Sequence, residues 1–321
     1  MGGSTVLVLA QQTDPSADLV VDALNRRNVP VMRFDVADHP QRVILTAEHF
    51  GGHWSGTLVG LDRAVDLESV RAVHLVRPAP PDPPAAVVGP AREWAIGESA
   101  AAVYGVLESL PVPWVTRPRL LIDAQGKPRQ LVIAAFCGLR TPRTLITSDP
   151  AAARAFAQGS DRPVGYKPIH PAGVRLNVGP SWESVPFRLI DPNDLDDSVR
   201  ATAHLFQEFV PKQNEVRLTV VGRHMFAVAI HAGSAAARVD WRTDYAALTY
   251  DPISVPSDVA EGVRRFQEHY KLNFSAMDFV VSPDGTWTFL ENNPAGQWGW
   301  IELAAKVPIA DAIAELLTED A

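Results

Sequence analysis

The sequence has little cysteine, no long apolar run and no excess of positive charge. Cys137 is the single cysteine among 321 residues, so no disulfide can form within the chain, and a reducing cytoplasmic location is expected. No stretch approaches the roughly 18 consecutive apolar residues of a membrane span, and the opening residues lack the basic segment of a signal peptide. The formal net charge of −8 argues against non-specific nucleic-acid binding. A disulfide scaffold, a membrane-spanning protein and a general nucleic-acid binder are therefore not expected.

The remaining composition is that of a globular protein, with 46% hydrophobic and 21% charged residues. At roughly 100–200 residues per domain, the length predicts two or three structural units with room for a cleft between them. Small ligands usually bind in such clefts. The 27 prolines are spread along the chain, which indicates loop punctuation and not a low-complexity segment.

The first third of the chain has the pattern of a parallel βαβ unit. A short apolar strand at Thr5–Ala10 is followed by an amphipathic helix over Ala17–Arg27 and a second strand within Val29–Val36. The stretch Arg42–Arg77 reads as shorter strands separated by glycines, as in a hairpin. After a proline-rich loop, the pattern predicts a helix of about Pro90–Ser109.

The later part predicts an antiparallel sheet with helices around it. A helix is expected over Gln125–Cys137, and an acidic helix over Asp191–His204. The segments VVGRHMF and SPDGTWTF lie between apolar runs and have the composition of hairpin turns. A final helix is expected over roughly Trp300–Leu317.

Three oxygen-bearing side chains form a candidate metal site near the end of the chain. If the second predicted hairpin forms, Asp278 faces Glu291 across it, and Asn293 lies two residues further on the same face. A few hard oxygen donors that leave room for water and phosphate suit magnesium. The alternative is a solvated hairpin with a turn aspartate and an asparagine at a helix entry. The apolar neighbours Phe279 and Val280 disfavour that alternative, because buried acids are costly without a cation.

Two further groups have the composition of a phosphate and a nucleotide site. Lys167 in a short strand and Lys127 at a helix start could both point into one cleft and neutralise a polyphosphate. Gln207–Val210 would offer an apolar strand end to a flat base, and Glu215 could accept ribose hydroxyls. Taken alone, the lysines could equally be solvated surface residues, and the third group an ordinary strand and loop.

The order of these motifs resembles the ATP-grasp superfamily, and within it the ligases that crosslink peptides to make microviridin-type graspetides. The matching motifs are QEFVPKxxEVR from Gln207, DWR from Asp240, and DFxxxxDGxxxFLENNPxGQW from Asp278, with Lys167 before them. The resemblance implies an α/β (α+β) protein in which two α+β subdomains hold the nucleotide behind an N-terminal pre-ATP-grasp α/β domain. The expected units are residues 1–115 (pre-ATP-grasp), 116–205 (central) and 206–321 (C-terminal).

The same resemblance implies ATP and Mg²⁺ as cofactors and a role for each matching residue. The loop His170–Gly179 would cover the phosphates. The implied contacts are Lys127 and Lys167 to phosphates; Gln207, Glu208, Phe209 and Val210 to adenine, with Glu208 and Val210 acting through their backbone; Glu215 to ribose; and Asp278, Glu291 and Asn293 to magnesium.

The implied activity is macrocyclisation of a ribosomally made precursor peptide. ATP would phosphorylate Asp or Glu side chains, and Ser, Thr or Lys side chains would attack the acylphosphates to form esters or amides. Arg217 and Arg242 would hold the carboxylate or the transferring phosphoryl group, unless they form plain salt bridges. The acidic residues Asp194, Asp196 and Asp197 are either a solvated helix start or a contact for a basic residue of the leader peptide.

Two other functions stay open from the sequence. One is a RimK-like ligase that adds glutamate or another amino acid to a protein or small molecule, and the other is a nucleotide-binding regulator without catalysis. The DWR motif and the sequence pattern of the N-terminal part favour the macrocyclase. The presence of all the candidate magnesium ligands and both candidate phosphate-binding lysines disfavours the regulator. A homodimer is compatible with the resemblance, although no patch in the sequence indicates it.

Overall fold

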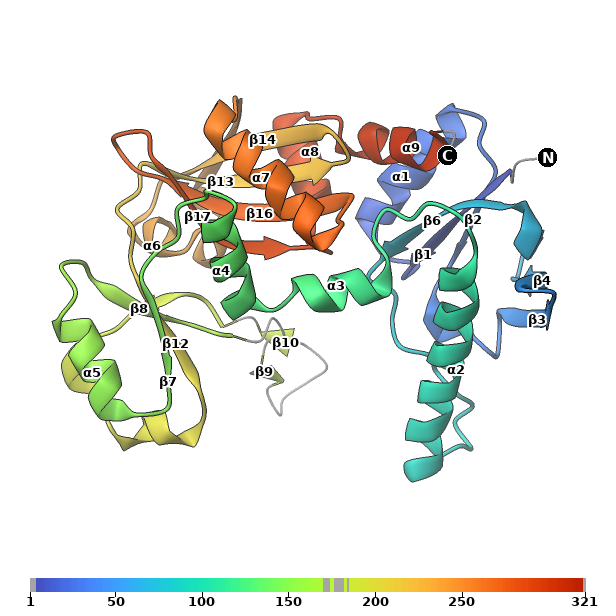
Figure 1. Ribbon diagram of the computed structural model, residues 1–321, viewed down its shortest axis with the longest axis horizontal. Coiled ribbons are helices and arrows are strands. Elements are labelled where there is room, and N and C mark those ends of the chain that lie inside the picture. Colours follow the sequence, from blue (N-terminus) through green and yellow to red (C-terminus); the bar gives the residue numbers. More distant parts are fainter. Residues whose placement is uncertain (1–3, 170–173, 176–181, 184, 320–321) are drawn as a thin grey trace.

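The computed structural model describes residues 4–169, 174–175, 182–183 and 185–319 as a mixed helix and sheet protein (Figure 1). Within these residues, no helix has both the length and the apolar character needed to cross a lipid bilayer. The predicted phosphate-covering loop His170–Gly179 lies outside the described residues except for Val174 and Arg175, which pair with Trp182 and Glu183 as the short strands β9 (Val174–Arg175) and β10 (Trp182–Glu183).

The N-terminal part contains the predicted parallel βαβ unit. Strand β1 (Thr5–Ala10) pairs in parallel with β2 (Val31–Phe34) on one side and β6 (Val70–Val76) on the other. Helix α1 (Pro15–Arg26) begins where the Asp14 carboxylate accepts hydrogen bonds from the amides of Ser16 and Ala17, a typical N-cap. The remaining elements are β3 (Ile44–Phe50), β4 (His53–Val59) and β5 (Ala64–Asp66), which form a small antiparallel sheet, the 3₁₀ turns η1 (Val36–Asp38) and η2 (Leu67–Ser69), and the long helix α2, which covers Pro90–Ser109 as predicted.

The central sheet has the strand order β11-β8-β12-β7. Its members are β7 (Thr144–Thr147), β8 (Val164–Lys167), β11 (Arg188–Leu189) and β12 (His204–Glu208), with helix α5 (Pro150–Gln158) beside them.

The predicted acidic helix over Asp191–His204 is wrong. The segment forms two 3₁₀ turns, η3 (Pro192–Asp194) and η4 (Asp197–Ala201), before β12. The carboxylates of Asp191 and Asp196 each accept a hydrogen bond from the amide two residues ahead. Such local bonds offer the backbone an alternative to a continuous helix.

The C-terminal sheet has five antiparallel strands in the order β15-β14-β13-β16-β17. Helices from two distant parts of the chain, α4 and α7, pack together over one face of it, so the helices before the central sheet join the C-terminal core (Figure 1). The strands are β13 (Asn214–Val221), β14 (His224–Ala232), β15 (Leu248–Ile253), β16 (Phe274–Val281) and β17 (Trp287–Asn293), and the helices around them are α3 (Pro118–Ala124), α4 (Lys127–Phe136), α6 (Ala235–Val239) and α7 (Ser257–Tyr270), with the 3₁₀ turns η5 (Trp241–Thr243) and η6 (Tyr245–Ala247).

The predicted final helix is two helices, α8 (Gly299–Ala305) and α9 (Ile309–Thr318). Lys306 adopts a left-handed conformation with φ 55°, and Pro308 follows it, so the first helix ends and the second starts in a new direction. The break lets α9 lie against α1 of the N-terminal part.

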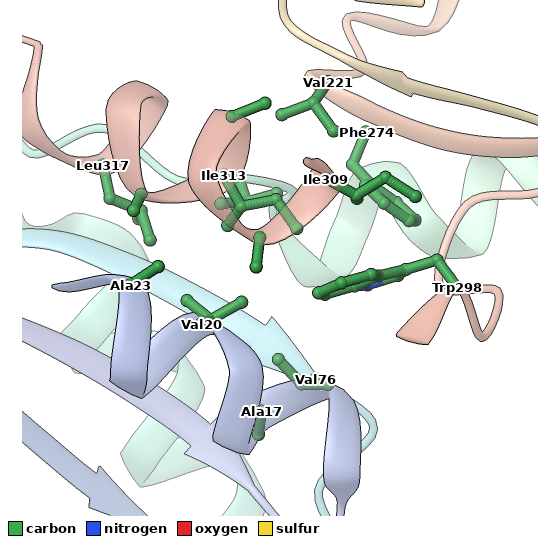
Figure 2. Close-up of a cluster of buried hydrophobic side chains, with 14 of the residues drawn as sticks. Ala17, Val20, Ala23, Val76, Val221, Phe274, Trp298, Ile309, Ile313 and Leu317 are labelled. Atoms are coloured by element: carbon green, nitrogen blue, oxygen red, sulfur yellow. The ribbon is translucent and has the colours of Figure 1, made fainter. Parts of the chain in front are cut away.

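One hydrophobic core joins the first and last parts of the chain. Figure 2 shows Ile309, Ile313 and Leu317 of α9 facing Val20 and Ala23 of α1. The same cluster also includes Val76 of β6, Val221 of β13, Phe274 of β16 and Trp298. The N-terminal sheet and the C-terminal sheet are therefore held together by shared burial.

Candidate functional site

The two candidate acids lie opposite each other on neighbouring strands. Asp278 of β16 and Glu291 of β17 are paired in register, and both side chains are buried. The pairing slips by one residue directly after Asp278, so Leu290 is an extra residue in β17. Asn293 follows two residues after Glu291, and its side-chain nitrogen Nδ2 lies 3.4 Å from Glu291 Oε1. The convergence expected from the hairpin is therefore present.

Both candidate lysines converge on Glu291. The Nζ of Lys167, at the end of β8, lies 2.9 Å from Glu291 Oε2, and the Nζ of Lys127, at the start of α4, lies 3.3 Å from the same oxygen. Lys127 also donates to the carbonyl of Pro168 at 2.8 Å. Burial opposes the charge of Glu291, but Lys167, Lys127 and Arg242 hold the pKa of its carboxyl well below the usual range.

Two arginines occupy the other side of the acids. Arg217 of β13 pairs in register with Asp278, and its Nη1 lies 3.3 Å from Asp278 Oδ1. Arg242 Nη2 lies 2.9 Å from Asp278 Oδ2 and 3.5 Å from Glu291 Oε1. Burial alone would lower the pKa of Arg242, but the surrounding carboxylates of Asp278, Glu291 and Asp240 raise it above its usual value. Arg242 is thus a fixed positive charge between the two acids.

Trp241, which the sequence reasoning left without a role, supports both arginines. Its ring stacks on Trp300 with centroids 5.1 Å apart, and the guanidinium carbons of Arg242 and Arg217 lie 4.8 and 5.9 Å from its centroid. Asp240 Oδ1 accepts a hydrogen bond from the Arg242 amide at 3.0 Å. The three residues of the DWR motif are therefore in contact with one another in the site. The position of Trp241 in the middle of this motif was the signal by which the sequence could have identified it.

A pocket adjoins this charged cluster at the end of β12. It is lined by every residue expected at the base and the ribose, together with Lys167 and Arg242. Lys212, which the sequence reasoning did not single out, lies at its wall, where its Nζ bonds Glu215 Oε1 and donates to the Val239 carbonyl at 3.0 Å. Burial raises the pKa of Glu215, and Lys212 opposes that rise. The lining residues are Lys167, Phe187, Gln207, Glu208, Phe209, Val210, Lys212, Glu215, Val239, Asp240, Arg242, Val280 and Leu290.

The side chains of Gln207 and Glu208 are already bonded to protein groups. Gln207 Nε2 donates to Thr144 Oγ1 at 2.9 Å, and the Glu208 carboxylate accepts from Ser160 at 2.8 Å. The Glu208 amide donates to the carbonyl of Arg143 and the Phe209 amide to that of Pro163. Among the described residues, the Val210 amide has no such partner, which leaves it free to meet a ligand.

The three acids expected to contact a leader peptide lie away from this pocket. Asp194 belongs to η3, and Asp196 is the N-cap of η4. Asp197 is 90% exposed and pairs with Arg200 at 3.2 Å. They share an exposed stretch of the central part beside α5.

The acids and the amide fit a magnesium ion by their donor chemistry. No cluster of three or more His, Cys, Asp or Glu residues occurs among residues 4–169 and 185–319, so the donor set there is two carboxylates and one amide. Because one nitrogen of Arg242 contacts both carboxylates, their oxygens already converge on a single positive point. All three donors are hard oxygens, as magnesium prefers.

The chain is similar to several ligases of known structure. Residues 5–119 match the family described as MvdD pre-ATP grasp domain. A RiPP-associated ATP-grasp ligase from Chryseobacterium gregarium, solved with ADP and a leader and core peptide, is 26% identical, with a TM-score of 0.87 over 99% of this chain and 96% of that one. The Microcystis aeruginosa macrocyclase MdnC, bound with precursor peptide MdnA, is 28% identical, with a TM-score of 0.84 and 98% of both chains covered.

A third solved structure, the macrocyclase MdnB from the same organism, is 27% identical, with a TM-score of 0.81 over 99% of this chain and all of that one. Among curated proteins, no sequence matches this chain. The likeness to these ligases covers 98–99% of this chain, and so includes its N-terminal, central and C-terminal parts.

Proposed function

Because this chain belongs to the ATP-grasp ligases with an MvdD-type pre-ATP-grasp domain, the group of the graspetide ligases, we propose that it is a macrocyclase of a ribosomally made precursor peptide. It would activate Asp or Glu side chains of the peptide with ATP and join them to Ser or Thr hydroxyls, or to Lys amines. The likeness to ligases solved with precursor peptides supports a peptide as the partner.

One observation carries the proposal, namely the excess of positive charge around two buried acids. Lys127, Lys167, Arg217 and Arg242 all contact Asp278 or Glu291 within 3.5 Å. Arg242 also pairs with Asp240 at 3.4 Å, so three carboxylates leave one of these four cations uncompensated. Such a surplus suits a polyphosphate and a second carboxylate held side by side, because catalysis of phosphoryl transfer depends mainly on positioning and charge neutralisation.

The adjoining pocket suits the rest of the nucleotide. With the Glu208 amide used by Arg143, its carbonyl can accept from the adenine amino group, and the Val210 amide can donate to a ring nitrogen. Glu215 would accept hydrogen bonds from the ribose hydroxyls. Magnesium held by Asp278, Glu291 and Asn293 would neutralise phosphate oxygens.

The chemistry has two balanced steps. A carboxylate oxygen of the peptide attacks the γ-phosphorus, the bond to the bridging oxygen breaks, and ADP leaves with that electron pair. A hydroxyl or amine of the same peptide then attacks the acyl carbon, loses its proton and expels phosphate. Arg217 and Arg242 would orient the carboxylate and stabilise the charge of the transferring phosphoryl group.

The test is ADP release with Mg²⁺ and ATP, with and without candidate precursor peptides encoded beside the gene, while intact peptide mass is followed. Each crosslink should remove about 18 Da, one water, as condensation of an activated carboxylate requires. A mass gain would indicate an amino-acid ligase, and nucleotide binding without turnover would indicate a regulator.

A pair of variants on one hairpin controls the experiment. Asp278→Asn should abolish the mass loss, because it removes one of the two buried acids. Asp284→Asn, in the exposed turn between β16 and β17, should leave it unchanged. Equal activity in both variants would contradict the assignment of Asp278.

A further inference from the structure

Gln130 connects helix α4 to the strand that carries two of the predicted magnesium ligands. It lies on α4 one turn after Lys127 and is only 1% exposed. Its side-chain Oε1 accepts from the backbone amide of Asn292 at 2.9 Å, and its Nε2 donates to the carbonyl of the same residue at 2.8 Å. Asn292 is the residue between Glu291 and Asn293.

The pairing has the form of an extra strand on β17. A side-chain amide that both donates to and accepts from one residue reproduces the bonds a neighbouring strand would make. Because successive side chains of a strand point to opposite faces, Glu291 and Asn293 share the face away from residue 292. Fixing the backbone at residue 292 therefore fixes both of them without touching either.

The same helix also delivers a cation to the site. Lys127 and Gln130 are three residues apart, so both lie on the side of α4 that meets β17, and Lys127 reaches Glu291 Oε2 at 3.3 Å. Gln130 Nε2 also donates to the carbonyl of Ala124, at the end of α3, at 2.7 Å. One amide thus sets the register of α3, α4 and β17 against each other.

We propose that Gln130 is a positioning residue that holds Glu291, Asn293 and Lys127 in one arrangement for magnesium-bound nucleotide. The proposal rests on the proposed function and names a residue with no direct contact to the ligand. Its loss should weaken magnesium-dependent nucleotide binding, because groups that orient metal ligands typically contribute about 10–100-fold to metal affinity.

The experiment measures ADP binding by calorimetry over a range of Mg²⁺ concentrations. For Gln130→Glu, which keeps the size but replaces the donating nitrogen with oxygen, the Mg²⁺ concentration for half-maximal ADP affinity should rise on the order of tenfold. Gln130→Asn keeps the amide on a shorter side chain, and should shift the requirement in the same direction. It also preserves a test if the first variant does not fold.

Gln267→Glu is the matched control. Gln267 is another buried glutamine, 7% exposed, on α7 against the same sheet, and its Oε1 accepts from Ser275 of β16 at 2.6 Å. This variant should lower thermal stability without changing the Mg²⁺ requirement. If the Gln130 variants shift only thermal stability, as Gln267→Glu does, the proposal is overturned. If the unchanged protein itself shows no Mg²⁺-dependent ADP binding, the proposed function fails first.

Discussion

Arg242 contacts three carboxylates through a planar group that lysine cannot reproduce. Its guanidinium lies 2.9 Å from Asp278, 3.5 Å from Glu291 and 3.4 Å from Asp240. Arg242→Lys keeps the charge but loses the planar guanidinium with its several N–H donors. Turnover should fall by about 10²-fold or more, as it does when a hydrogen-bond donor to the transition state is removed. ATP affinity should change only a few-fold. Steady-state rates and nucleotide calorimetry would measure the two effects separately.

The exposed Arg264 on α7, which pairs with Glu261, offers the control. Arg264→Lys should leave both quantities unchanged. Turnover in Arg242→Lys equal to that of the unchanged protein would remove Arg242 from the catalytic step.

His74 should make stability fall in mild acid. It is buried in β6 with neither ring nitrogen bonded to a described residue, and burial lowers its pKa from 6.5 to about 3. In the unfolded chain, His74 therefore binds a proton below about pH 6.5, whereas in the folded protein it stays neutral down to about pH 3. Stability should drop by roughly 2 kcal/mol between pH 6.5 and 5 from this residue.

Chemical unfolding of His74→Leu at both pH values tests this expectation. The variant should lose less stability on acidification than the unchanged protein does, whereas His49→Leu, at an exposed position, should follow the unchanged protein. Parallel pH profiles for all three proteins would show that another group governs the acid sensitivity.

At the residue level, the sequence predicted contacts that depend on local pairing. A hairpin brings Asp278 and Glu291 to neighbouring strands, as alternation and turn position predicted. A regular register would pair Asp278 with Leu290, and the one-residue slip after Asp278, which the pattern did not predict, places Glu291 opposite it. Gln130 and Lys212 were not found, since a lone glutamine in a helix and a lysine in a loop carry no periodic signal. Their partners, residue 292 and Val239, are distant in sequence and become neighbours only through the tertiary fold.

Two glycines in helices should respond oppositely to alanine. At Gly105 in α2 an added methyl group would meet open space, so Gly105→Ala should raise stability by about 0.5–1 kcal/mol through helix propensity. At Gly262 in α7 the methyl carbon would lie 2.6 Å from Leu139 Cδ2 and 3.2 Å from the Cys137 carbonyl oxygen. Gly262→Ala should therefore destabilise by about 1–3 kcal/mol despite the better propensity.

Scanning calorimetry of the two variants would decide between crowding and propensity. A higher melting temperature for Gly262→Ala would mean that Leu139 moves aside without cost. In that case the packing of α7 on the loop after α4 would be looser than the distances indicate.

Elements with a strong local signal were predicted best. Helix α2 was anticipated to its observed ends, and the two hairpin turns contain Gly222 and Gly285 at φ 53° and 82°, which glycine adopts without strain. The helix predicted from Asp191 was wrong, because the acidic residues of this segment cap short 3₁₀ turns instead of starting an α-helix. The final helix was predicted to run through Pro308, although this proline directly before Ile309 indicated a new helix start.

At the scale of the whole molecule, the shared core should couple distant parts in unfolding. Ile313 of α9 is fully buried between α1 and the rest of its cluster, so Ile313→Ala should cost about 2–5 kcal/mol (Figure 2). Limited proteolysis should then cut the N-terminal sheet faster, since α9 covers α1. Ile122→Ala, at a position 75% exposed on α3, should change neither quantity.

Proteolysis confined to residues near α9 would contradict this coupling. It would show that the N-terminal sheet keeps its structure without the last helix.

The domain boundaries near residues 115 and 205 remain predictions for the same reason. Helices α3 and α4 follow the first boundary but pack with the C-terminal strands, and α9 packs on the N-terminal part. Boundaries placed along the sequence cannot describe structural units in which a helix from one segment packs into the core of another. The predicted homodimer and leader contact likewise stay predictions, because each depends on a second polypeptide.

The position of α9 also affects how the protein matures on the ribosome. Strand β6 ends at Val76, yet the helix that covers its neighbour α1 begins at Ile309. A nascent chain that has emerged only through the first sheet therefore presents the apolar side of α1 to solvent for most of synthesis. Chaperones that bind apolar segments would have their longest opportunity to bind there, and a ribosome stalled before Ile309 would release a chain in which α1 lacks the helix that covers it.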